Sequence, residues 1–386
     1  MRTFTLKKKA LSLVAITSLL TLTVVAVPTV ARAADPACQT AAGVTTCVGT
    51  TSDNAKYMMM VPANYNGTSM LWSHGYRYPV DLPASIPLVG GYKVTDTAEP
   101  APGGNATVIG GLLSQGVAVF GSGFARQGWN ADSALKTNVE LIGIFKKQFP
   151  ATKKVIAWGG SLGGFITQAL AEKYPDLITA AAPLCMAAGT VEAELTMAGD
   201  FLWVFKTFFD PTIKAGNYSA GAAGYAEAMT DIGKVFVAMG ALQAAVATGA
   251  WPETAKVPDA LKAIPSRSAL LLAGLIAGIP TQSAHFDGTT GPDGPLKTSF
   301  PLAISPALAV LENGTNAAVL AILATYDVEL QSGGAIFDNS ATDYSARIAE
   351  SKIVYNAALS GAGAISGMLG YLAAVPRAKA IPAAQT

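Results

Sequence analysis

Charged side chains are scarce in this sequence. Lys, Arg, Asp and Glu make up 13% of the 386 residues, whereas hydrophobic residues make up 51%. No basic patch or arginine-rich helix stands out, so no nucleic-acid partner is expected, because such partners are bound mainly through clustered Lys and Arg. The chain is long enough to bury a substantial core, in one large or two modest domains.

Histidine is almost absent, since only His74 and His285 occur in the whole chain. The glycine motifs of phosphate loops, G-x-x-x-x-G-K-[ST] and a G-x-G-x-x-G after a strand, are missing as well. Asp287 and Asp293, with glycines near them, lack the D-x-[DN]-x-[DN]-G spacing of a calcium loop. We therefore expect no metal site and no phosphate loop.

The first 33 residues have the pattern of a secretory signal peptide. Met1–Ala10 carries four basic residues, Leu11–Val27 is apolar, and Ala31–Ala33 is an A-x-A cleavage site. An uncleaved membrane anchor is the alternative, because the apolar run is long for a signal. Removing residues 1–33 takes away five basic residues and no acidic ones, which leaves 21 Lys and Arg against 25 Asp and Glu. We expect a mildly acidic, secreted protein that is not stably inserted in a membrane.

The three cysteines predict one disulfide and one free thiol. Cys38 and Cys47 lie close together just past the cleavage site, and an oxidising compartment favours a disulfide between them. Such a short loop contributes about 2–3 kcal/mol, mainly by tying down a chain end. Cys185 falls in the apolar segment Ala180–Met186, which we interpret as a strand with a buried thiol.

The most informative stretch is Lys153–Tyr174. It predicts a buried strand over Val155–Trp158, a glycine-rich turn that carries Ser161, and an amphipathic helix after the turn. G-x-S-x-G between a strand and a helix is the motif of a nucleophile elbow, whose strained serine needs small neighbours where strand and helix approach. Gly159 and Gly163 fill those positions. The alternative is an ordinary glycine-rich turn.

Strands and helices alternate between residues 44 and 186. The predicted strands are Val44–Gly49, Lys56–Val61, Ser69–Ser73, Gly116–Gly121, Val155–Trp158 and Ile178–Cys185. The predicted helices are Asn105–Gln115, Ser133–Phe149 and the helix after Ser161. This alternation implies parallel crossovers, and hence an α/β fold with a mostly parallel sheet flanked by helices.

Only helical segments are predicted beyond residue 187. They are Val191–Phe209, Ala220–Thr248, Pro265–Ile279, Pro301–Tyr326 and Asp343–Leu372. We divide the chain into a signal peptide (1–33), an α/β core (34–186), a mainly helical cap (187–376) and a C-terminal tail (377–386). Five aromatic residues crowd one cap helix and are expected to be mostly core, with one or two forming an apolar acyl pocket. They are Phe201, Trp203, Phe205, Phe208 and Phe209.

A serine nucleophile also needs donors for the oxyanion that forms when it attacks a carbonyl. In elbow geometry one donor is the backbone N–H of Leu162, and the second comes from the loop after the strand that ends at Ser73. His74, Gly75 and Tyr76 form that loop, and the N–H of Tyr76 is the expected second donor. Each such donor is typically worth about 3–4 kcal/mol in the transition state.

Three segments carry a family resemblance: Trp72–Tyr76 (WSHGY), Gly116–Phe124 (GVAVFGSGF) and Trp158–Gly164 (WGGSLGG). Together they resemble the α/β-hydrolase superfamily, in particular secreted bacterial serine hydrolases with a large helical cap, over roughly Thr45–Met186. The resemblance implies an α/β-hydrolase-type fold. It also implies esterase, lipase or peptidase chemistry through an acyl-enzyme on Ser161, with no cofactor.

The chain departs from this family in its base and acid. The family places an acid and then a His on loops after two further strands, whereas this sequence runs from helical segments to its last residues, Pro382–Thr386. We therefore expect a sheet that is incomplete at its C-terminal edge. His285, in a cap loop, is the candidate base, oriented by Asp287. An ordinary histidine on the cap rim is the alternative.

Other residues are weaker candidates. An acid after the sixth strand, such as Glu192, Glu194 or Asp200, is an alternative partner for the histidine. His74 is expected to shape the oxyanion loop, with the role of base as its alternative. Arg126 is expected either to line the cleft or to be an ordinary loop residue, and so is Trp129.

The expected function is the hydrolysis of carboxylic esters. The apolar cap favours hydrophobic acyl or aryl esters over polar peptides. Two alternatives stay open: a serine peptidase on the same fold, and a non-catalytic protein, either a diverged binding module or the product of a shortened reading frame.

Overall fold

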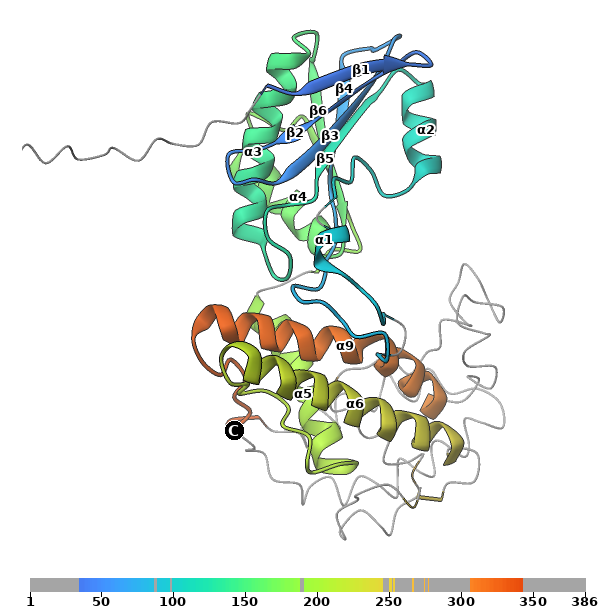
Figure 1. Ribbon diagram of the computed structural model, residues 1–386, viewed down its shortest axis with the longest axis vertical. Helices are drawn as coiled ribbons and strands as arrows, with labels where there is room; N and C mark the ends of the chain where they lie inside the picture. The colour runs from blue at the N-terminus through green and yellow to red at the C-terminus, as the bar shows by residue number, and fades with distance from the viewer. Residues whose placement is uncertain are drawn as a thin grey trace, which may run out of the picture.

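The computed structural model describes residues 35–342, with gaps at 87–88, 98 and 188–190, and with only isolated positions between 246 and 305. Figure 1 shows an α/β part, and a helical part that faces one end of the sheet. The predicted signal peptide (1–33) and tail (377–386) lie outside the described residues.

The α/β part is built on a mixed sheet of seven strands in the order β1-β2-β3-β5-β4-β6-β7. The strands are β1 (Ala37–Ala41), β2 (Val44–Thr50), β3 (Lys56–Pro62), β4 (Thr68–Ser73), β5 (Ala118–Ser122), β6 (Lys154–Gly160) and β7 (Ala180–Leu184). β1, β2, β3 and β5 pair antiparallel in that order, whereas β5, β4, β6 and β7 pair parallel. The predicted α/β sheet is confirmed, and in the described part of the chain β7 forms one edge.

Helices cover both faces of the sheet (Figure 1). α3 (Ala131–Gln148) and α4 (Leu162–Lys173) lie on one face and α2 (Ala106–Ser114) on the other. On α3 the apolar positions repeat at helical spacing, so Leu135, Ile142 and Phe145 are buried together. Phe145 stacks on Phe120 of β5 with a ring-centroid distance of 4.2 Å. This packing holds the sheet rigid beneath the loops that follow its parallel strands.

The helical part has a hydrophobic cluster of its own. It contains α5 (Val191–Phe208), α6 (Gly221–Ala245) and α9 (Pro306–Ser332), and α9 packs against both of the others. The five aromatic residues of the segment 201–209 are all less than 5% exposed, which agrees with their expected place in the cap core. Leu82 and Ile86, from the long segment between β4 and the short helix α1 (Val94–Thr97), pack in the same cluster. This segment therefore ties the end of β4 to the helices.

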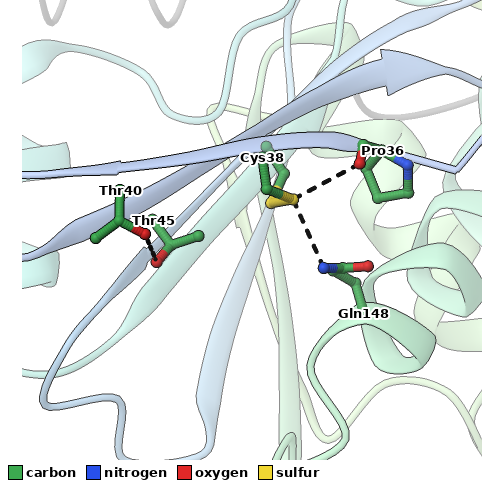
Figure 2. Close-up of a disulfide and its surroundings, with 6 residues drawn as sticks. Pro36, Cys38, Thr40, Thr45 and Gln148 are labelled. Carbon is green, nitrogen blue, oxygen red and sulfur yellow. Dashed lines mark hydrogen bonds between the residues drawn. A yellow bond between two sulfur atoms is a disulfide. The ribbon is translucent and has the colours of Figure 1, made fainter.

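A disulfide joins the first two strands, as predicted. Cys38 and Cys47 face each other across the β1–β2 hairpin, and Figure 2 shows the bond beside the end of α3. Thr40 and Thr45 share a hydrogen bond of 2.9 Å between their hydroxyls. The sequence did not predict β1, because all five of its residues are exposed and it lacks the alternation of a half-buried strand.

The prediction for Cys185 was wrong. Strand β7 ends at Leu184, and Cys185 lies in the turn after it, exposed and with a φ of 43°. The apolar character of this segment comes from three alanines and a proline, and β7 runs along the sheet edge with mostly exposed residues. Small apolar residues and proline are tolerated at such an edge without being buried.

Within the described residues, no helix is long and apolar enough to cross a membrane.

Candidate active site

The loops that follow the parallel strands lie together at the carboxyl ends of these strands, because strands that run the same way end on the same side of the sheet. His74 follows β4, and Ser161 follows β6. The segment after β5 carries Arg126 and Trp129, and Cys185 follows β7. The carboxyl ends of the strands face the helical part of the molecule (Figure 1), so a site here has the sheet on one side and the helices on the other.

Ser161 has the conformation of a nucleophile elbow. Its φ is 56° and its ψ is −124°, a region that non-glycine residues rarely occupy and that costs about 1–3 kcal/mol. The strain is held by hydrogen bonds on both sides: the Ser161 N–H donates to the Leu184 carbonyl at 3.0 Å, and its carbonyl accepts from Gly164 at 2.9 Å. The side chain is exposed at the start of α4, as a nucleophile must be.

The flanking glycines are required by close backbone contacts. A Cβ atom on Gly159 would lie 2.4 Å from the Gly163 carbonyl oxygen and 2.5 Å from that of Ser73. A Cβ atom on Gly163 would lie 2.0 Å from the Ser73 oxygen and 2.7 Å from that of His74. The neighbouring atoms are backbone and cannot move aside cheaply, so β4, β6 and α4 approach this closely only through glycine.

Two amide groups next to Ser161 are unused. The N–H of Leu162 opens α4, where helix geometry offers it no acceptor. Neither this N–H nor that of Tyr76 donates a hydrogen bond in the described part of the chain. The loop that carries Tyr76 touches the elbow, because a Cβ atom on Gly75 would lie 3.4 Å from the Cβ of Ser161. Two free donors beside an exposed serine are what an oxyanion hole requires.

His74 is a buried, neutral residue of this loop. It is 5% exposed, and burial lowers its pKa from 6.5 to about 4, with the positive charge of Arg77 acting in the same direction. Its Nδ1 lies 2.7 Å from the Gly75 carbonyl oxygen; since a carbonyl only accepts, the neutral ring carries its proton on Nδ1. The other ring nitrogen is buried and has no hydrogen-bond partner. His74 therefore bonds within its own loop, and no hydrogen bond joins it to Ser161 among the described residues.

A buried carboxylate on α9 joins the helical part to the loop after β5. Asp327 is 2% exposed and accepts hydrogen bonds from the Arg126 guanidinium and, at 2.7 Å, from the Trp129 N–H. Arg126 also donates to the Trp129 carbonyl at 2.9 Å. A Cβ atom on Gly128 would lie 2.3 Å from the Asp327 carboxylate. Burial raises the pKa of Asp327, and these donors oppose the rise.

Aromatic rings connect this junction to the oxyanion loop. The ring of Tyr76 lies 6.4 Å from that of Trp129 and 6.0 Å from that of Tyr78. Burial raises the pKa of Tyr76 well above 10, and the nearby charge of Asp327 adds to the rise. The Tyr76 hydroxyl and the indole N–H of Trp129 are both buried without a hydrogen-bond partner among the described residues.

An apolar pocket of about 110 Å³ opens beside Trp129. α5 contributes Leu195, Ala198 and Phe201, and α9 contributes Ala321 and Ala324. Glu194 is the one ionisable side chain among the described lining residues, and burial raises its pKa. Phe201, one of the five aromatic residues of the segment 201–209, lines this pocket together with Trp129.

The structure brings some of the predicted site residues together and leaves others undescribed. Ser161, Leu162, the flanking glycines and the loop that carries Tyr76 lie together at the carboxyl ends of β4 and β6. His285, the candidate base, and Asp287, its candidate acid, lie outside the described residues. Of the alternative acids, Glu194 lines the apolar pocket and Asp200 is 1% exposed. The side chain of Glu192 is among those left undescribed.

Sequence reasoning missed the role of Asp327. It accepts from Trp129, 198 residues earlier in the chain, and no motif spans that distance. The only local signal was an acidic residue in a mostly apolar helical stretch. Among the described residues, no group of three or more His, Cys, Asp and Glu side chains is placed to hold a metal ion.

Comparisons with known proteins found structural likenesses only. No protein-family model and no curated protein matches the chain. An esterase of Pyrococcus furiosus is 17% identical with a TM-score of 0.27, and the match covers 41% of this chain and 56% of that one. The rice cell wall degrading esterase of Xanthomonas oryzae is 12% identical with a TM-score of 0.34, over 79% of this chain and 97% of that one.

Lipase A of Candida antarctica is 15% identical with a TM-score of 0.32, over 54% of this chain and 52% of that one. The chain thus spans about half the length of this lipase and of the Pyrococcus esterase. These three structures are two esterases and a lipase. At these TM-scores, the function has to be derived from the geometry of the site itself.

Proposed function

We propose that this protein is a secreted serine hydrolase that cleaves carboxylic esters through an acyl-enzyme on Ser161. One observation carries the proposal: Ser161 is exposed in a strained elbow, and two free N–H groups belong to Leu162, which follows it in the chain, and to Tyr76, whose loop touches it at Gly75. The Ser161 oxygen attacks the ester carbonyl, and the two N–H groups stabilise the tetrahedral oxyanion. The alcohol then leaves with a proton, and water releases the acid from the serine.

The proposal includes His285 as the general base and Asp287 as the acid that orients it. Serine needs a base to take its proton, and His74, the one other histidine, is neutral, buried and without a hydrogen bond to Ser161. His285 and Asp287 are two residues apart, which keeps the proposed acid near the proposed base along the chain.

Hydrophobic acyl or aryl esters are the proposed substrates. The lining beside Trp129 is almost wholly apolar, so it gains free energy by covering apolar groups and would lose it by desolvating the charges of a peptide. Export is supported by the disulfide between Cys38 and Cys47, since such bonds persist in oxidising compartments.

The test is covalent labelling of the folded protein with a fluorophosphonate, read out as intact mass. We expect one adduct on the wild type, none on Ser161→Ala, and an undiminished adduct on the control Ser114→Ala, which changes an exposed serine on α2. His285→Ala should then slow labelling by at least about 10²-fold if this histidine is the base. No adduct on a protein that folds normally would contradict the proposed catalysis and favour the alternative of a binding protein.

A further inference from the structure

The apolar pocket beside Trp129 is small. Its volume of about 110 Å³ is below that of an engineered apolar cavity of roughly 150 Å³ that stays dry and binds benzene. Ala321 and Ala324 of α9 line the pocket and are 6% and 4% exposed, so two buried methyl groups border its space. A chain of about four carbons or a single ring is the largest group that a space of this volume encloses; the pocket is open at its rim, so atoms beyond that length lie outside it.

The pocket also has apolar surface that the protein leaves uncovered. Met197 is 46% exposed and Leu320 is 40% exposed, and both line it, from α5 and α9 respectively. Exposed large apolar side chains that border a cavity lined by others of their kind are typical of a ligand site.

Contacts lead from this pocket to the nucleophile. Trp129 lines the pocket and its ring lies 6.4 Å from that of Tyr76. Tyr76 follows Gly75, whose Cβ position would be 3.4 Å from that of Ser161. The same two residues carry buried donors without partners, the Tyr76 hydroxyl and the Trp129 indole N–H.

We propose that this pocket receives the acyl group of the ester and limits it to short, uncharged chains or a single ring. This rests on the proposed function of Ser161. The acyl group stays attached to the serine through both half-reactions, whereas the alcohol leaves after the first. A pocket that fits the acyl group therefore contributes to both transition states, which is where selectivity for chain length arises.

Glu194 adds selection by charge. It lines the same pocket and has no hydrogen-bond or ion-pair partner among the described residues. An acyl chain that ends in a carboxylate would bring a second negative charge next to the Glu194 carboxylate, and two like charges repel each other. The site should therefore reject half-esters of dicarboxylic acids.

The first experiment compares p-nitrophenyl esters from acetate to decanoate. For the wild type we expect kcat/KM to rise about fourfold per methylene up to about four carbons beyond the carbonyl, and then to stop rising. Ala324→Phe fills the pocket, so the butyrate-to-acetate ratio should fall from about 16 to near 1. Leu330→Phe, at an exposed position of the same helix, should keep the wild-type ratio.

The second comparison uses two five-carbon acyl groups, p-nitrophenyl valerate and the p-nitrophenyl half-ester of glutaric acid. Glu194→Gln should raise the glutarate-to-valerate ratio by about tenfold. The proposal is overturned if the wild-type rate keeps rising to decanoate, if Ala324→Phe keeps the wild-type ratio, or if chain length matters only in the alcohol part. A glutarate-to-valerate ratio that Glu194→Gln does not change would overturn the charge selection.

A binding measurement separates failure of the pocket from failure of catalysis. Methyl 4-fluorobenzoate is added to Ser161→Ala and followed by ¹⁹F NMR line broadening. We expect broadening that disappears in the double variant Ser161→Ala/Ala324→Phe and persists in Ser161→Ala/Leu330→Phe. Broadening of this kind in a protein that hydrolyses no ester would support the pocket and contradict the catalytic role. No broadening in Ser161→Ala would overturn the pocket, whatever the wild type hydrolyses.

Discussion

Acid should destabilise this protein through His74. The ring is 5% exposed, and its pKa is about 4 in the folded chain against 6.5 as its ordinary value. The unfolded chain therefore binds a proton below about pH 6.5, whereas the folded chain resists until about pH 4. The stability that the neutral ring contributes is complete above pH 6.5 and is lost as the pH falls to 4. A shift of this size corresponds to about 3 kcal/mol.

The assay is urea unfolding followed by tryptophan fluorescence between pH 7.5 and pH 4. His74→Asn removes the titrating group and keeps an N–H that is able to donate to the Gly75 carbonyl. The wild type should lose about 3 kcal/mol more than His74→Asn over this range, because carboxylates that titrate in both proteins cancel in the difference. Equal losses in the two proteins would refute the reasoning, since they would mean that His74 takes up its proton equally in both states.

Three further perturbations test the framework of the site. Gly163→Ala should destabilise the fold by more than about 2 kcal/mol and abolish labelling of the serine, since its Cβ would meet backbone at 2.0 Å; Gly143→Ala, in open space on α3, should be neutral or stabilising by about 1 kcal/mol. Asp327→Ala removes the acceptor of the Trp129 N–H and of the Arg126 guanidinium, so it should lower the unfolding free energy in urea by about 2–3 kcal/mol. Loss of the exposed Asp132 ion pair should lower it by less than about 0.5 kcal/mol. Cys38→Ser should lower the unfolding free energy by about 2–3 kcal/mol, and a loss that persists when both proteins are reduced would contradict this cause.

The elbow could be predicted from sequence because its requirements are local. A serine between glycines, after a buried strand and before a helix, has few conformations that avoid collisions, and the observed φ of 56° at Ser161 follows from them. The strands and helices of the α/β part could be predicted for the same reason, since the spacing of apolar residues reports which side of an element is buried. The Cys38–Cys47 disulfide could be predicted from the short sequence separation of the two cysteines.

Other features depend on which elements come to lie together, and no local pattern records that. β1 is a strand only because it pairs with β2 in a register that sets Cys38 opposite Cys47. Cys185 is exposed because β7 lies at the edge of the described sheet, although its neighbours have the composition of a buried strand.

The sequence by itself determined the strained turn at Ser161 with its flanking glycines, the sheet and helices around it, and the apolar helical segments that follow. The tertiary structure alone decided that Asp327 of α9 bonds to the loop of Trp129, and that Trp129 then stands between Tyr76 and an apolar pocket. The reason is physical: residue spacing encodes the conformation of one segment, whereas a pocket is the space left when several segments pack, and its size depends on all of their side chains at once.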